Sequence, residues 1–130
     1  NESAMTNIFA LNHVSLLVKD TARALEFYQG LLGLELDESR PQMSFHGAWL
    51  VVGTAQIHLL EMPSVNAPAD LPEHGGRDRH FALDVLDLGA IEVALEAADI
   101  PYKLSRSGRR ALFCRDPDGN AVELVERVTG

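Results

Sequence analysis

The 130-residue sequence has a single cysteine, few aromatic residues and no long apolar stretch. Because Cys114 has no second cysteine to pair with, an intrachain disulfide is excluded, and a reducing, cytoplasmic location is expected. No apolar run approaches the ~18 residues that a membrane span requires, so no membrane partner is expected. The lysines and arginines form no polybasic run, and the net charge of −8 argues against nucleic acid as a partner.

The residues that are present favour a folded globular protein. Hydrophobic residues make up 46% of the chain, which is enough for a sizeable core. Residues 1–4 precede Met5 and are interpreted as a vector remnant, so they are left out of the fold prediction.

An internal repeat organises the sequence. Residues 11–18 and 80–85 align with His13 on His80, and each apolar segment is followed by an aspartate, Asp20 or Asp87, that is suited to cap a helix. Apolar residues at helical spacing then predict helices over 21–32 and 88–98.

The remainder of each half has room for three strands. We predict them near 34–38, 47–52 and 57–61 in the first half, and near 102–105, 109–114 and 122–126 in the second. The Asp-Pro-Asp-Gly segment at 116–119 is a strong turn signal before the last strand. The predicted fold is therefore α+β, with two tandem βαβββ modules at 5–62 and 80–130 and a linker at 63–79.

Four polar residues occupy matched places in this repeat. Strand side chains alternate between faces, and the apolar neighbours of these four residues are assigned to the core face. His13, His58, His80 and Glu123 should therefore all point away from the core. Taken singly, each one is more simply an ordinary strand residue, but their joint, matched occurrence favours a shared site. Three imidazoles and a carboxylate suit a borderline divalent ion such as Zn, Ni, Co, Mn or Fe.

At these residues the chain resembles the vicinal oxygen chelate superfamily, which includes glyoxalase I, fosfomycin-resistance thiol transferases, type I extradiol dioxygenases and bleomycin-binding proteins. The segments at 47–50 and 57–60 look most like glyoxalase I-like proteins. The resemblance covers residues 10–128, and its motifs lie at 12–15, 27–33, 47–50, 57–60, 79–82 and 116–126.

The resemblance implies paired modules whose curved mixed sheets surround a metal cleft, and it implies frequent homodimers. The modules then pair either within one chain or between chains, so His13 and His80 come either from one subunit or from two. It implies a metal that chelates two adjacent oxygens of a small substrate. Our leading hypothesis is a metal-dependent lyase or isomerase of the glyoxalase type, with Glu123 as ligand and base and glutathione or another thiol as cosubstrate. Glyoxalase I has glutamate at the position of His58, and this difference places the usual glyoxalase I substrate in doubt for this chain.

Three alternatives stay open. A fosfomycin-type thiol transferase fits Lys103 and Ser107, which fall at that family's substrate and potassium contacts, but Phe113 stands where a tyrosine is expected. An extradiol dioxygenase would need an open coordination position on its metal ion, and His58 would occupy that position. A metal-independent, bleomycin-type binding protein fits the acidic charge but not the complete ligand set.

Other residues are assigned secondary roles. The candidate substrate contacts are Ser15, Trp49, Lys103, Arg109 and Phe113. Arg109 is included because a guanidinium can bind a carboxylate or phosphate in a bidentate way, and the same reason applies to its neighbours Arg106 and Arg110. Each has a plainer interpretation as a strand or loop residue. Cys114 is interpreted as a buried, inert thiol, and His46 and His74 as surface residues that are unmatched in the repeat.

Overall fold

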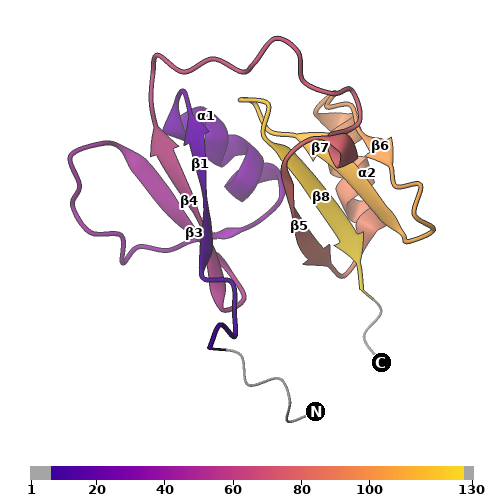
Figure 1. The fold of residues 1–130 in the computed structure, drawn as a ribbon, viewed down its shortest axis with the longest axis horizontal. Coiled ribbons are helices and arrows are strands. Elements are labelled where there is room, and N and C mark those ends of the chain that lie inside the picture. The colour runs from indigo at the N-terminus through magenta and orange to yellow at the C-terminus, as the bar shows by residue number, and fades with distance from the viewer. Residues whose placement is uncertain (1–6, 128–130) are drawn as a thin grey trace.

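Two four-stranded mixed sheets stand side by side in the structure, a computed structural model that describes residues 7–127 (Figure 1). The predicted vector remnant at 1–4 lies outside the described residues. The first sheet has the order β1-β4-β3-β2 and the second β5-β8-β7-β6. The α+β prediction with two tandem βαβββ modules is confirmed.

The elements follow the predicted order closely. The first half contains β1 (His13–Val18), α1 (Thr21–Leu25), η1 (Glu26–Leu31), β2 (Glu35–Leu36), β3 (Gly47–Val52) and β4 (Ala55–Glu61). The second half contains β5 (His80–Val85), α2 (Leu88–Ala97), β6 (Lys103–Leu104), β7 (Ala111–Arg115) and β8 (Ala121–Glu126). The short helical turn η2 (Gly75–Arg77) lies between the halves.

Strand register bears out the repeat residue by residue. In the first sheet β1 runs parallel to β4, and Ser15 lies opposite His58. In the second sheet β5 runs parallel to β8, and Ala82 lies opposite Glu123. Since Ser15 and Ala82 each follow a repeat histidine by two residues, the alignment of His58 with Glu123 is correct in three dimensions.

The helix expected over 21–32 differs from the prediction in its second half. Asp20 caps α1 as predicted, since its carboxylate accepts from the backbone N–H of Ala22 at 2.9 Å. From Glu26 onward the chain forms a π-helix, and Leu32 N–H donates to the Phe27 carbonyl five residues earlier. A π turn holds one more residue than an α turn, which helical spacing in a sequence does not reveal.

Strands β2 and β6 are shorter than predicted because polar side chains turn the chain. The Asp37 carboxylate accepts from both the backbone N–H and the hydroxyl of Ser39, which ends β2. After β6, Ser107 N–H donates to the hydroxyl oxygen of Ser105. Such local side-chain hydrogen bonds compete with the strand ladder.

One core joins the two halves. The apolar faces of β4 and β8, with Ile57, Leu59, Val122 and Leu124, belong to the same buried cluster. That cluster also holds residues of both helices, among them Phe27, Tyr28, Leu88 and Leu95. The assignment of strand faces from alternation is therefore correct for the core.

A buried hydrogen bond ties the first helix to the predicted turn of the second half. The Tyr28 hydroxyl donates to Asp116 Oδ2 at 2.7 Å, although the residues are 88 positions apart. Asp116 starts the predicted turn, which Gly119 closes with a φ of 87° and a hydrogen bond to the Asp116 carbonyl. Burial raises the pKa of Asp116, and hydrogen bonds from Tyr28 and Asn120 oppose that rise.

The linker arches over the top of both sheets in Figure 1, and its η2 turn rests on the second sheet. A Cβ at Gly75 would meet the Cβ atoms of Ala121 and Phe113 at 3.3 Å, and one at Gly76 would meet the Phe113 ring at 3.1 Å. Glycine at these positions therefore allows the linker backbone to lie directly on Phe113. Over residues 7–127, none of the helices combines the length and apolar character needed to cross a bilayer.

Candidate functional site

Three aromatic rings stack along the non-core face of the first sheet. Trp49, His58 and Ser15 lie opposite one another on β3, β4 and β1. The ring of His58 lies between the rings of Trp49 and His13. Its centroid is 4.2 Å from that of Trp49, at an interplanar angle of 6°, and 4.0 Å from that of His13, at an interplanar angle of 14°. The first sheet therefore presents Trp49, His58 and His13 as one row of rings.

A chain of hydrogen bonds fixes which His58 nitrogen carries the proton. The Gln56 amide nitrogen donates to the Asp37 carboxylate at 2.6 Å, so the Gln56 amide oxygen faces His58 Nε2 at 2.9 Å. Nε2–H must donate, which leaves a lone pair on Nδ1. Burial and the neighbouring His13 hold the pKa of His58 below its usual value, which favours the neutral ring.

The same stacking restricts what the two histidines can do together. Asn12 Oδ1 lies 2.7 Å from His13 Nδ1 and accepts its proton, so His13 presents Nε2. An imidazole binds a metal through a lone pair that lies in the plane of its ring. Because the planes of His13 and His58 are nearly parallel and about a ring thickness apart, one ion cannot lie in both. In this arrangement the pair offers a single metal ligand.

The second sheet carries a matching row. Lys103, Phe113 and Glu123 lie opposite one another on β6, β7 and β8. Glu123 is 3% exposed although it faces away from the core, so the prediction of its face is correct while its burial was not foreseen. Both of its oxygens are engaged: Oε1 lies 3.4 Å from His80 Nε2, and Oε2 lies 2.9 Å from the Arg109 guanidinium.

The distance between His80 and Glu123 is compatible with two ligands of one ion. The Asp78 carbonyl oxygen, which can only accept, lies 2.9 Å from His80 Nδ1, so Nδ1 carries a proton, and in the neutral ring the lone pair is on Nε2. A backbone carbonyl in that role is the usual partner of a metal-binding histidine. Two donors bound at ~2.1 Å with angles of ~90–109° lie roughly 3.0–3.4 Å apart. The observed separation of 3.4 Å falls in this range.

The structure brings the predicted ligands together in two pairs and not in one group. His13 meets His58 on the first sheet, and His80 meets Glu123 on the second. Within residues 7–127, no three histidine, cysteine, aspartate or glutamate side chains are placed to hold a metal ion. Each sheet therefore carries one pair of the predicted ligands, a candidate half-site.

The other predicted site residues have structural partners as well. Lys103 forms an ion pair with Glu73 at 3.3 Å, and Arg109 holds Glu123. Phe113 is buried, with its ring edge-on to His80 at 5.1 Å. Its ring also lies 4.9 Å from that of His74, a partly exposed residue that has a packing contact which its sequence did not predict. The adjacent Gly75-Gly76 was the sequence signal for this close contact.

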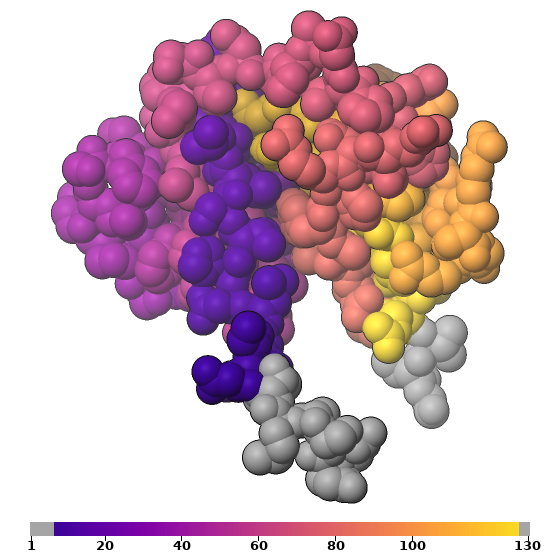
Figure 2. Space-filling model, viewed as in Figure 1, coloured from indigo at the N-terminus to yellow at the C-terminus, as the bar shows by residue number. Residues whose placement is uncertain are grey.

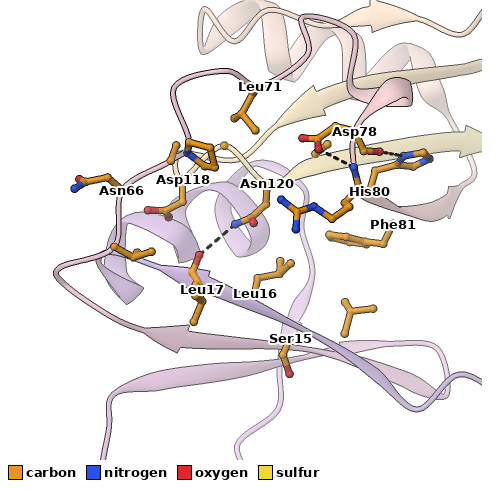
Figure 3. Close-up of a pocket in the computed structure, with 17 residues that line it drawn as sticks. Ser15, Leu16, Leu17, Asn66, Leu71, Asp78, His80, Phe81, Asp118 and Asn120 are labelled. Carbon is orange, nitrogen blue, oxygen red and sulfur yellow. Dashed lines mark hydrogen bonds between the residues drawn. The ribbon is translucent and has the colours of Figure 1, made fainter.

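A cleft of about 530 Å³ runs between the two sheets. In Figure 2 the linker lies across the top of this region, and a notch between the two halves opens at the lower edge of the molecule. In Figure 3, Leu16 and Phe81 point into the cleft, whereas the Ser15 hydroxyl and the His80 ring point away from each other. The cleft therefore opens mainly on the core-facing residues of β1 and β5, and Ser15 and His80 also border it although their side-chain ends point in opposite directions.

The thiol of Cys114 is not part of either row. It is buried in the core, and burial next to Asp116 raises its pKa to about 12. The prediction of a buried thiol is confirmed, and so high a pKa makes it a poor nucleophile at neutral pH.

Comparison with known proteins gives a consistent result. The family described as the Glyoxalase/Bleomycin resistance protein/Dioxygenase superfamily matches residues 10–124. The chain is 33% identical to Glyoxylase I 4 of Arabidopsis thaliana, covering 91% of this chain and 71% of that protein. It is 30% identical to a lactoylglutathione lyase of Haemophilus influenzae, covering 88% and 90% of the two chains.

Relatives differ in length, and a solved structure shares the fold. The chain spans less than half the length of two further plant relatives that carry lactoylglutathione lyase names. A glyoxalase/dioxygenase from Nostoc punctiforme superposes with a TM-score of 0.80 at 20% identity, covering 97% of this chain and 96% of that one. At this identity the likeness supports the fold alone.

Proposed function

Because the chain belongs to the glyoxalase/bleomycin resistance protein/dioxygenase superfamily, we propose that it is a divalent-metal-dependent lyase or isomerase. Its substrate would be a small molecule with two adjacent oxygens. The observation that carries the proposal is the pair formed by His80 Nε2 and Glu123 Oε1 at 3.4 Å, with the other His80 nitrogen held by the Asp78 carbonyl. Zn, Ni, Co, Mn and Fe all suit this donor set.

Three residues would hold the ion: His80 and Glu123 from the second sheet, with His13 from the stacked His13–His58 pair of the first. When bound, the ion supplies Lewis-acid stabilisation of negative charge on a substrate oxygen. Glu123 Oε1 would also accept and return the proton that moves during isomerisation. Arg109 would keep the carboxylate turned so that Oε1 faces His80, since its guanidinium holds Oε2 at 2.9 Å.

A second copy of the chain would complete the site. The pairs lie on separate sheets of one chain, and no described group of three ligands forms within it. We therefore propose a homodimer in which the first sheet of one chain faces the second sheet of its partner. Trp49 and Ser15 would then contact the substrate from one chain, and Phe113 and Lys103 from the other.

A thiol adduct is the proposed substrate class. The relative from Haemophilus influenzae is named lactoylglutathione lyase, which supports a glutathione adduct of a small oxoaldehyde as the first substrate to test. His58 in place of a second carboxylate leaves Glu123 as the single proposed base. We propose a cytoplasmic location, where such thiols are reduced, from the single buried cysteine.

Mixing two inactive variants tests the shared site. Chains carrying His13→Ala lack a first-sheet ligand, and chains carrying Glu123→Gln lack a second-sheet ligand. If the site forms between chains, mixed dimers regain one intact site, so metal binding and turnover of the adduct return on mixing. If the site forms within one chain, every site keeps a defect and nothing returns. Stoichiometric metal without turnover of any adduct would contradict the proposed reaction.

A further inference from the structure

A second cavity, of about 510 Å³, lies beside the half-site of the second sheet. Its walls come from the linker and from the loop between β6 and β7, and they include His74, Arg77, Ser105, Arg106, Ser107 and Phe113. Phe113 joins the two places, because its ring contacts His74 on the cavity side and His80 on the half-site side. A ligand in this cavity would lie against Phe113, next to the proposed reacting centre.

The lining of the cavity is mostly apolar, and two exposed arginines, Arg77 and Arg106, are among the residues that border it. Within residues 7–127, neither Arg77 nor Arg106 forms an ion pair, whereas Lys103, Arg109 and Arg110 each pair with a carboxylate. The adjacent carboxylates of Glu73 and Glu123 are thus already matched by their own cations. In a chain with a net charge of −8, two unmatched arginines on one cavity favour an anionic ligand.

Hydroxyl groups add neutral donors. The hydroxyl oxygens of Ser105 and Ser107 lie 2.8 Å apart, so one hydroxyl donates to the other. Two hydroxyls have two protons, and the second proton has no acceptor among the described residues. His74 is not a further cation of this set, because its Nδ1 accepts from Gly76 N–H and its Nε2 faces the Leu104 carbonyl at 3.3 Å.

We propose that this cavity binds an anionic group of the substrate, either a carboxylate or a phosphate, through Arg77, Arg106 and the Ser105–Ser107 hydroxyls. Guanidinium groups bind both anions by paired hydrogen bonds. This inference rests on the proposed function only for the position of the reacting end of the substrate, at His80 and Glu123. The substrate would then be elongated, with its adjacent oxygens at His80 and Glu123 and its anionic end beyond Phe113.

Binding to the metal-free protein tests the cavity separately from the reaction. Inorganic phosphate and succinate serve as the two probes, and backbone amide NMR shifts report the site. We expect saturable shifts at Gly76, Arg77 and residues 105–107, with the preferred probe distinguishing a phosphate from a carboxylate. Arg77→Gln and Arg106→Gln should each weaken binding by at least ~10-fold, the effect of losing a charge-assisted hydrogen bond.

Arg110→Gln is the matched control. It removes the same charge from the same loop, but Arg110 pairs with Glu92 and Glu126 and does not line the cavity. Binding in this variant should stay within about two-fold of the wild type. The proposal is overturned if neither probe binds saturably, or if Arg110→Gln weakens binding as much as Arg106→Gln. His80→Ala should abolish metal binding and leave anion binding intact, so failure of the metal site and failure of the cavity are distinguishable.

Discussion

Replacing Tyr28 with phenylalanine should destabilise the protein by about 2 kcal/mol, the contribution of one hydrogen bond to a charged acceptor. Tyr28 is 0% exposed, and the phenylalanine ring would fill the same space, so no cavity term is added. The lost bond is the 2.7 Å contact with Asp116 that joins the two halves of the chain. Urea unfolding followed by circular dichroism would measure the free energy of unfolding for both proteins.

The loss should depend on pH. Burial raises the pKa of Asp116 and the Tyr28 hydrogen bond lowers it, so Tyr28→Phe should raise it further. A carboxyl whose folded-state pKa is raised contributes stability below its unfolded pKa, and that contribution is lost as pH rises through the folded pKa. The variant should therefore be more destabilised at neutral pH than near the ordinary aspartate pKa of 3.8.

Tyr102→Phe provides the control. Its hydroxyl donates to the exposed Glu96 carboxylate at 2.6 Å. Removing this surface contact should cost less than ~0.5 kcal/mol at either pH. Equal losses in Tyr28→Phe and Tyr102→Phe, or a larger loss for Tyr28→Phe at acid pH, would refute the reasoning about the buried bond.

Two further predictions follow from burial. Cys114, with its pKa raised to about 12, should resist alkylation at neutral pH in the folded protein and react promptly in denaturant; rapid reaction of folded protein would show that the thiol is exposed. Arg109→Gln should cost about 1–2 kcal/mol of unfolding free energy in metal-free protein, because it leaves the buried Glu123 without its cation. The matched control is Arg127→Gln, because the partner of Arg127, Asp84, is 61% exposed, and this change should cost less than ~0.5 kcal/mol. Urea unfolding measures both costs, and equal losses of unfolding free energy in Arg109→Gln and Arg127→Gln would contradict this account.

Much of the fold could be predicted because strand patterns and turn chemistry are local signals. The predicted strand at 47–52 matches β3, and the repeat aligned His58 with Glu123, which the structure places opposite Ser15 and Ala82 in matching parallel strand pairs. The π-helix after Leu25 was not foreseen, since the apolar spacing of 21–32 fits an α-helix equally well. Tyr28 lies in this π-helix and donates to Asp116 in the other half of the chain, a long-range contact that apolar spacing does not report.

The candidate site could be predicted only in part. Alternation placed His58 and Glu123 on the non-core face, but burial of Glu123 arises from Arg109, His80 and the neighbouring strand. These contacts are set by side-chain conformation and by loop position, which periodicity does not encode. The same holds for His74, whose linker has no strand or helix pattern and yet folds back onto Phe113.

Metal content of the protein purified without chelator is the most direct test of the central claim. The account predicts about one divalent ion per chain. Metal binding should be lost in His80→Ala and kept in His46→Ala, an exposed histidine outside both rows. A wild-type protein without stoichiometric metal, or a His80→Ala variant that binds metal as tightly as His46→Ala, would contradict the proposed metal site.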